Sequence, residues 1–247
     1  TRFGLVMAMA GNAVGLGNFL RFPGLAAKYG GGFMVPYLIA LFVVGIPLMW
    51  MEWAIGRHGG AYGHGSTPGM YHRMWKHPVS KYLGVLGVLL PTVIALYYFY
   101  VESWALGYAW QTITGEYWGK TSQGEMKDLF VSYLGADKPG VAFGTEAYLF
   151  FLVTFVLNFV VIGRGISKGI EIVAKYAMPT LVIFGCILVV RVLTLPPVDG
   201  RTMGDALSSI WVVDWSVLKD PKLWMAATGQ IFFTLSLGYG MIMAFAS

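Results

Sequence analysis

The sequence MAGNAVGLGNFLRFP, residues 9–23, determines the predicted fold. It overlaps an uncharged run, residues 3–20, that is long enough to cross a bilayer as one helix. Glycine lowers helix stability, and a polar side chain at membrane depth needs a partner. Both kinds of residue crowd the middle of this run: Gly11, Asn12, Gly15, Gly17 and Asn18. We therefore expect the span to unwind near its centre and its backbone to line a binding site.

The composition of the chain is that of a membrane protein. Hydrophobic residues make up 57% of the 247 residues and charged residues only 12%, about half the share found in soluble domains. The mean hydropathy is +0.64. The net charge of +5 does not indicate nucleic-acid binding, because the basic residues lie in loops between apolar spans. A single cysteine, Cys186, excludes a disulfide bond within the chain.

Six apolar segments predict one transmembrane domain over residues 1–247. We expect membrane helices near residues 3–27, 32–56, 80–112, 146–163, 168–193 and 223–247. The loops on the N-terminal side of the membrane are the shorter ones and the denser in positive charge. The N-terminus is therefore predicted to be cytoplasmic, in a multi-pass protein of the plasma membrane.

The last apolar segment repeats the anomaly of the first. Residues 234–240, TLSLGYG, place two glycines and two hydroxyl groups in the middle of the span. Two glycine-interrupted segments, one near each end of the chain, indicate a transporter site at the interface of inverted repeats. The N-termini of half-helices attract anionic groups, and the exposed carbonyl and hydroxyl oxygens suit a hard cation.

Other interpretations of these features remain open at this point. Gly11 and Gly15 form a GxxxG pair, which can serve helix packing alone. An ion channel can also use broken helices, although a selectivity filter usually repeats one motif symmetrically. An enzyme is not expected, because HExxH and paired intramembrane aspartates are absent from the sequence. The loop histidines fit no metal pattern and are interpreted as solvated: His58, His64, His72 and His77.

Five motifs resemble the neurotransmitter:sodium symporter family, and in particular its bacterial amino-acid branch. They are GNAVGLGNFLRFP (11–23), PLMWMEWAIGR (47–57), ALYYFYVESW (95–104), RGISKGIE (164–171) and GQIFFTLSLGYG (229–240). The resemblance implies an all-α polytopic membrane protein with the LeuT-like inverted-repeat fold. The chain would hold the first five-helix repeat and the start of the second, with helices 1 and 6 discontinuous and the sequence ending inside helix 6.

The resemblance further implies two sodium sites. One ion would be bound by the Ala13 carbonyl, the Asn18 side chain and Thr234, together with the carboxylate of the substrate. The second would be bound by the carbonyls of Gly11 and Val14, with its other ligands on a later helix. Sodium is thus the expected cofactor, whereas chloride or proton coupling is not determined.

The substrate site implied by the resemblance lies between the two broken helices and the third span. The carboxylate of the substrate would be bound by Leu16, Gly17 and Tyr98. Carbonyls of Ala13, Phe233, Thr234 and Ser236 would meet the amino group, and Ile94, Phe233, Ser236 and Tyr239 would line the pocket. Tyr98 and Phe233 would form a lid below the gate residue Arg21, and Glu52 would support the break in the last segment.

The residue at position 15 indicates the substrate class. Monoamine members of the family carry an aspartate at the position of Gly15, which supplies the carboxylate that their substrates lack. Glycine here therefore implies a neutral amino acid, aliphatic or aromatic, because Tyr239 adds a hydroxyl group to the pocket. The expected function is a sodium-coupled symporter working by alternating access, as a monomer or a homodimer in the lipid bilayer. The alternatives are an ion channel or a membrane fragment that does not transport by itself.

Overall fold

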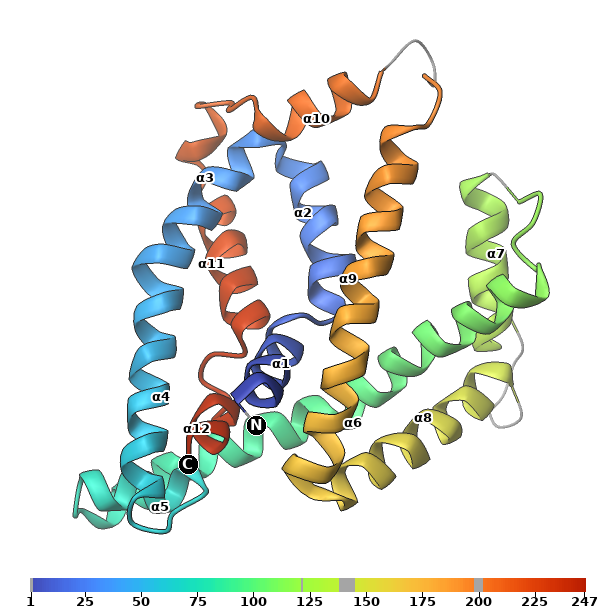
Figure 1. Ribbon diagram of the computed structural model, residues 1–247. Helices are drawn as coiled ribbons and strands as arrows, with labels where there is room; N and C mark the ends of the chain where they lie inside the picture. The colour runs from blue at the N-terminus through green and yellow to red at the C-terminus, as the bar shows by residue number, and fades with distance from the viewer. Residues whose placement is uncertain (1, 121, 138–144, 198–201) are drawn as a thin grey trace. The chain divides into compact units, whose positions relative to one another are not determined.

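The computed structural model describes residues 2–120, 122–137, 145–197 and 202–247, and within these residues the regular elements are all helices (Figure 1). The chain divides into two compact units. Unit 1 comprises Thr1–Pro91 and Glu171–Ser247, and unit 2 comprises Thr92–Ile170. The single transmembrane domain expected over residues 1–247 stays a prediction, and each unit is described by itself.

Unit 1 begins with the interrupted helix expected from residues 9–23. Helix α1 (Arg2–Ala13) is followed by the π-helix η1 (Gly17–Arg21) and by α2 (Phe22–Tyr29), and the two halves are bent by 46°. The non-helical backbone is limited to Val14 and Gly15, near the centre of the uncharged run. Gly11 and Asn12 remain helical because the helical hydrogen bonding of α1 continues to its end, where Val14 N donates to Ala10 O at 2.9 Å.

The remaining helices of unit 1 come from both parts of the sequence. The first part continues with α3 (Gly31–Ala40), η2 (Leu41–Gly45), α4 (Ile46–Gly60), α5 (Thr67–Met74) and the start of α6 (Pro78–Thr114). The second part contains α9 (Glu171–Leu193), α10 (Met203–Trp211), the short 3-10 helix η4 (Val217–Lys219), α11 (Pro221–Leu235) and α12 (Met241–Ala246). The predicted sixth segment is therefore also two helices with a break between them.

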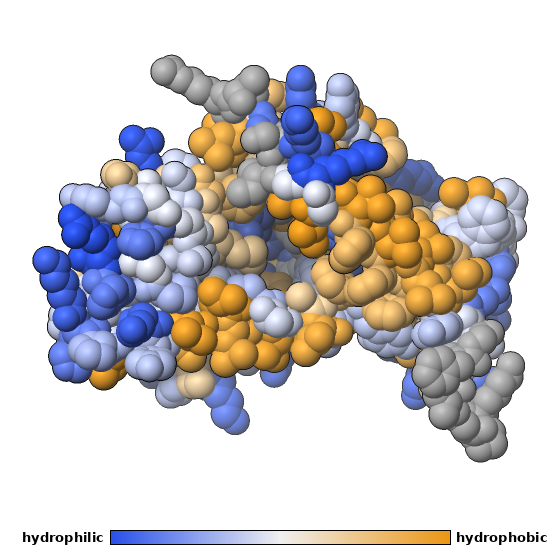
Figure 2. Space-filling model, turned by 90° about the horizontal axis from the view of Figure 1, so that it is seen from below, coloured by the Kyte–Doolittle hydropathy of each residue, from blue (hydrophilic) through white to orange (hydrophobic). Residues whose placement is uncertain are grey.

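Several helices are long and apolar enough to cross a membrane. In the described residues there are four: Gly31–Gly60, Pro78–Thr114, Glu146–Gly163 and Lys168–Leu193. The bent pair Phe3–Ala13 and Gly17–Tyr29 makes a fifth if it is one span. Helices α11 and α12 are individually shorter, so the predicted count of six spans stays a prediction. Broad hydrophobic areas on the face shown in Figure 2 fit helices that are surrounded by lipid.

The core of unit 1 holds α11 and α12 against α3 and α4. One buried cluster joins Phe33 of α3 to Leu223 and Ala227 of α11. A second contains Ile231 of α11 and Ile242 of α12, with Leu237 from the break between them. Gly56 of α4 lies so close to α12 that a Cβ atom there would overlap the backbone of Met243. These contacts hold both halves of the interrupted helix against the helix pair α3–α4.

Unit 2 contains the C-terminal part of α6, then α7 (Gln123–Leu134), α8 (Glu146–Gly163) and the π-helix η3 (Ile166–Ile170). Aromatic side chains fill much of its interior, as where the rings of Tyr108 and Phe130 stack at 6.1 Å. Two polar pairs join α6 to α8. Gln111 Nε2 donates to Glu146 Oε2 at 3.3 Å, and Asn158 Nδ2 donates to Glu102 Oε2 at 3.0 Å.

The Glu102–Asn158 pair is expected to stabilise unit 2. Replacement of Asn158 by leucine removes the donor to Glu102 Oε2, and we expect the free energy of unfolding to fall by about 1 kcal/mol. Thermal unfolding of the detergent-solubilised protein measures this change. Thr112→Val is the matched control, because the Thr112 hydroxyl donates only within its own helix, to Tyr108 O at 2.7 Å. Equal stability of Asn158→Leu and the unsubstituted protein would contradict the prediction.

Candidate functional site

The breaks of the two interrupted helices meet inside unit 1. Three hydrogen bonds connect them directly. Thr234 Oγ1 donates to Asn18 Oδ1 at 2.9 Å, Gln230 Nε2 donates to Gly17 O at 3.2 Å, and Ser236 Oγ donates to Asn12 O at 3.3 Å. The partners are more than 200 positions apart in the sequence, yet each bond joins one interrupted helix to the other beside their breaks. The polar groups exposed by unwinding are thus partly satisfied across the junction.

The backbone of the second break is unusual. Ser236 has a φ of 52° and is the one non-glycine residue with positive φ in the described part of the chain. Gly238 and Gly240 follow with φ values of 81° and 73°. Non-glycine residues held in this left-handed region cost free energy and concentrate at functional sites. The outlier at Ser236 therefore supports a functional role for the break between α11 and α12.

The oxygens expected to bind one sodium ion lie next to one another. Asn18 Nδ2 donates to Ala13 O at 2.9 Å, and Asn18 Oδ1 accepts the hydrogen bond from Thr234. A carbonyl, a carboxamide and a hydroxyl oxygen form the kind of ligand set that hard cations prefer. The described residues contain no group of three or more His, Cys, Asp or Glu side chains that could hold a metal ion. The donor chemistry fits sodium.

The second predicted sodium site involves the carbonyls of Gly11 and Val14. Gly11 lies in the last turn of α1, and Val14 directly follows the helix. The last carbonyls of a helix have no partner within it, so this position suits a cation. The structure thus places both residues at the end of the same half-helix, and their role as sodium ligands stays a prediction.

Leu16 and Gly17 stand at the start of the second half-helix. Leu16 is the residue before η1, and Gly17 is its first residue. The Phe233 ring of α11 lies against Gly17 so closely that a Cβ atom at position 17 would overlap it. The Arg21 guanidinium lies 5.9 Å from the centroid of the same ring. The predicted gate residues Arg21 and Phe233 are therefore in contact, beside the backbone predicted to bind a carboxylate.

Glu52 of α4 contacts the break in the second interrupted helix. Its side chain is only 7% exposed, and Oε1 accepts a hydrogen bond from the Gly238 N–H at 2.6 Å. Its other oxygen, Oε2, has no hydrogen-bond partner among the described residues. A buried carboxylate that binds an unwound N–H fixes the backbone conformation around that group.

Some predicted residues are not placed relative to this junction. Ile94 and Tyr98 lie on the part of α6 that belongs to unit 2, so their contact with the substrate stays a prediction. Tyr239 lies within the break itself, between Gly238 and Gly240. The histidines that were interpreted as solvated are exposed in the structure: His58, His64, His72 and His77.

Sequence reasoning missed Gln230. This side chain is fully buried, and its Nε2 donates to Thr234 Oγ1 at 3.1 Å as well as to Gly17 O. Its Oε1 has no hydrogen-bond partner among the described residues. The signal was available, because Gln230 is a polar residue in an apolar segment and lies four positions before Thr234, on the same helix face. Tyr37 of α3 was also missed and shares a hydrogen bond with Thr234.

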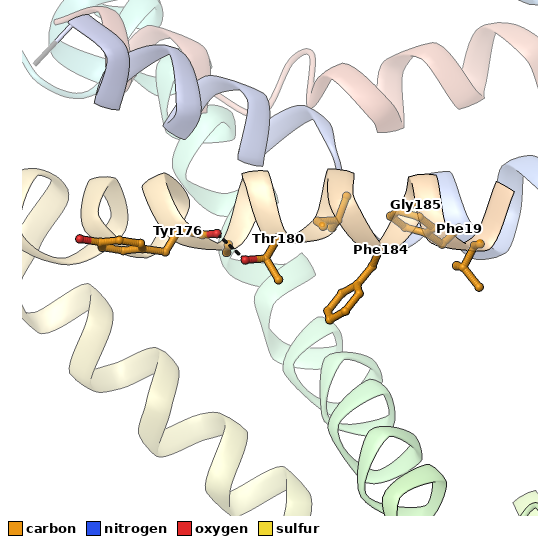
Figure 3. A pocket seen from close by; sticks show the side chains of 8 residues that line it. Phe19, Tyr176, Thr180, Phe184 and Gly185 are labelled. Carbon is orange, nitrogen blue, oxygen red and sulfur yellow. Dashed lines mark hydrogen bonds between the residues drawn. The ribbon is translucent and has the colours of Figure 1, made fainter. Parts of the chain in front are cut away.

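A groove elsewhere in unit 1 is not part of this junction. It has a volume of about 520 Å³ and is lined by Phe19 of η1 and by residues of α9 that include Tyr176, Thr180 and Phe184 (Figure 3). The Thr180 hydroxyl, which could offer a polar contact, already donates to Tyr176 O at 2.9 Å. The groove is thus largely apolar, unlike the junction of the two breaks.

Comparisons with known proteins show relatives of the whole chain. A family model described as the sodium:neurotransmitter symporter family matches residues 1–133 and 140–247. An uncharacterized sodium-dependent transporter of Methanocaldococcus jannaschii is 32% identical over 252 residues, which cover 100% of this chain and 48% of the relative.

Two animal proteins are also similar. The human inactive sodium-dependent neutral amino acid transporter B(0)AT3 is 31% identical, with 98% of this chain and 40% of the relative covered. The rat sodium- and chloride-dependent GABA transporter 2 is 28% identical, with 98% of this chain and 43% of the relative covered. The chain spans about half the length of the curated relatives it matches. It belongs to the sodium:neurotransmitter symporter family, a family of sodium-dependent transporters with the LeuT fold predicted above.

Proposed function

We propose that the complete protein containing this sequence imports a neutral amino acid, aliphatic or aromatic, together with sodium ions by alternating access. The observation that carries this proposal is the chain of hydrogen bonds from Thr234 through Asn18 to Ala13, which joins the two broken helices. A sodium ion that binds these three oxygens would couple the conformations of both helices to ion binding. Two sodium ions are proposed, the second at the carbonyls of Gly11 and Val14.

The proposed substrate class rests on the start of the second half of the first interrupted helix. Leu16 and Gly17 stand at the start of η1, where free N–H groups and the helix dipole favour a carboxylate. Position 15 is glycine, so the chain has no carboxylate of its own there. Two of the similar proteins carry names of transporters for neutral amino acids and for GABA, substrates that bring a carboxylate with them.

The proposed arrangement in the cell follows the charge pattern of the loops. The family and the apolar helices make the protein a multi-pass membrane protein. We propose that it lies in the plasma membrane with a cytoplasmic N-terminus, because the shorter and more basic loops lie on that side. We propose that six further residues complete the substrate pocket: Ile94, Tyr98, Phe233, Thr234, Ser236 and Tyr239. The protein would work as a monomer or as a homodimer.

Uptake into proteoliposomes tests the proposed function. We expect the complete protein to accumulate a labelled neutral amino acid with saturation kinetics, driven by a sodium gradient and lost when potassium replaces sodium. Flux that rises linearly with substrate concentration would instead indicate a channel. Accumulation that is unaffected by removal of sodium would overturn the proposed coupling.

Substitution of the proposed sodium ligands should weaken sodium binding more than substrate selectivity. Asn18→Ala and Thr234→Ala each remove one ligand oxygen, and we expect the sodium concentration for half-maximal uptake to rise at least about tenfold, equivalent to about 1.4 kcal/mol. The order of preference among substrates should be unchanged. Thr180→Ala is the control, because the Thr180 hydroxyl bonds only to its own helix. Unchanged sodium dependence in both variants would refute the assignment.

Tyr239 should affect selectivity and leave sodium dependence unchanged. Tyr239→Phe removes one hydroxyl group and keeps the ring. We therefore expect the apparent affinity for polar and aromatic substrates to fall relative to that for aliphatic ones by about 1 kcal/mol, roughly fivefold. Competition among unlabelled amino acids for uptake measures this ratio. A variant in which sodium dependence changes and the substrate order stays the same would place Tyr239 outside the pocket.

The role proposed for Glu52 depends on its acceptor oxygen. Glu52→Gln retains an oxygen for the Gly238 N–H, whereas Glu52→Leu leaves that N–H without its acceptor. We expect Glu52→Leu to lose about 1–3 kcal/mol of stability and Glu52→Gln to lose clearly less. Thermal unfolding measures both variants. If they are equally destabilised, the hydrogen bond to Gly238 is not what makes Glu52 important.

A further inference from the structure

The segment between Glu52 and Glu102 has an unusual charge pattern. It contains no acidic residue, yet it carries four lysine or arginine residues and all the histidines of the chain. The four are Arg57, Arg73, Lys76 and Lys81. They fall between the span Gly31–Gly60 and the span Pro78–Thr114, at the ends of these helices or in the connection. Because both flanking helices are candidate membrane spans, the connection between them lies at the bilayer surface.

The structure places the basic side chains of this segment at the surface of unit 1. All four are exposed, and we call them the basic surface: Arg57, Arg73, Lys76 and Lys81. The hydrophilic area at the left of Figure 2 lies on the side where Figure 1 labels α5. The Arg73 guanidinium lies 3.8 Å from the centroid of the Tyr62 ring, which holds this charge close to the surface of the molecule.

Buried contacts fix the backbone under the basic surface. Thr67 is 3% exposed, and its hydroxyl donates to Gly84 O at 2.6 Å, which ties the start of α5 to α6. Gly84 lies against Pro68 so closely that a Cβ atom would overlap it. Ser80 is 1% exposed, and its hydroxyl donates to His77 O at 2.6 Å. The charges are therefore presented from an ordered connection.

Large exposed apolar and aromatic side chains accompany these charges. Tyr62, Met74, Trp75 and Tyr82 are between 50% and 69% exposed. The Trp75 ring stacks on His77 with their centroids 5.1 Å apart. Tryptophan and tyrosine prefer the headgroup level of a bilayer, where an apolar ring and a polar tip are both accommodated. The combination of cations with exposed aromatic rings thus matches a lipid interface better than bulk water.

We propose that the basic surface binds the headgroups of anionic phospholipids in the leaflet that it faces. Clusters of four or more lysine and arginine residues next to a membrane helix attract anionic lipids, with each charge contributing about fivefold to binding. The segment itself contains no acidic residue that could offset these charges. This interaction is separate from the junction of the broken helices and does not depend on the proposed transport activity.

Other exposed lysines of the described residues have acidic neighbours in the sequence. Lys127 lies beside Asp128 on α7, and Lys219 and Lys222 flank Asp220. These three lysines are also exposed, so they offer a control for the replacement of three residues of the basic surface, with acidic neighbours in place of a segment that has none. An acidic protein is the other partner that four cations could attract. The bilayer is favoured because the two flanking spans hold the surface beside it at high effective concentration.

The experiment measures lipid binding to the complete protein purified in a neutral detergent. Short-chain phosphatidylglycerol and short-chain phosphatidylcholine are titrated separately, and bound lipid is counted by native mass spectrometry. We expect phosphatidylglycerol to bind at least tenfold more tightly than phosphatidylcholine. The triple variant R73Q/K76Q/K81Q should lose this preference, whereas K127Q/K219Q/K222Q should retain it. Equal preference in the two triple variants would overturn the proposal.

Further arms separate lipid from other anions. Inorganic phosphate and polyglutamate are added at matched charge, and neither should displace phosphatidylglycerol at comparable concentration. Displacement by phosphate would reassign the surface to a phosphate site, and displacement by polyglutamate would reassign it to an acidic protein partner. For the unsubstituted protein, a rise in salt to about 1 M shortens the screening length to about 3 Å, so the preference should disappear. A preference that is independent of salt would overturn the proposal without any variant.

Discussion

The structure depends on one constraint, which is that a backbone unwound at membrane depth must find hydrogen-bond partners inside the protein. Both interrupted helices meet this constraint at the same place. The side chains of Gln230 and Thr234 reach the first break, and the Ser236 hydroxyl reaches Asn12 O. Glu52 supplies the acceptor for Gly238 N from a third helix. Each break is therefore stabilised by groups that belong to other helices.

The same groups that satisfy the backbone form the candidate binding site. Ala13 O, the Asn18 carboxamide and the Thr234 hydroxyl are joined by two hydrogen bonds of 2.9 Å. A cation that takes these oxygens as ligands must replace interactions between protein groups, so ion binding and the relative position of the two helices are linked. The contact of Gly17 with Phe233 adds a steric element to this link, since only glycine leaves room for the ring.

Much of the fold could be predicted from the sequence, because its strongest signals are local. Gly15 next to Val14, and the glycines at 238 and 240, marked both breaks within a few residues. The exact bounds of the first break could not be predicted, since glycine content alone does not show that the helical bonding of α1 persists through Gly11. Gln230 was missed for a related reason: its importance lies in contacts with Gly17, which is distant in sequence. The division into two units was also not visible, because it depends on contacts between helices.

The bond between Glu52 and Gly238 has a consequence for the synthesis of the protein. Its two partners are 186 positions apart. Ribosomes add roughly 5–20 residues per second, so on the order of 10–40 s pass between the synthesis of Glu52 and that of Gly238. During that interval its carboxyl group stands near the end of a span that has already been made. Water or a lipid headgroup must accommodate it until Gly238 has been synthesised and inserted, which makes Glu52 a point of vulnerability in the nascent chain.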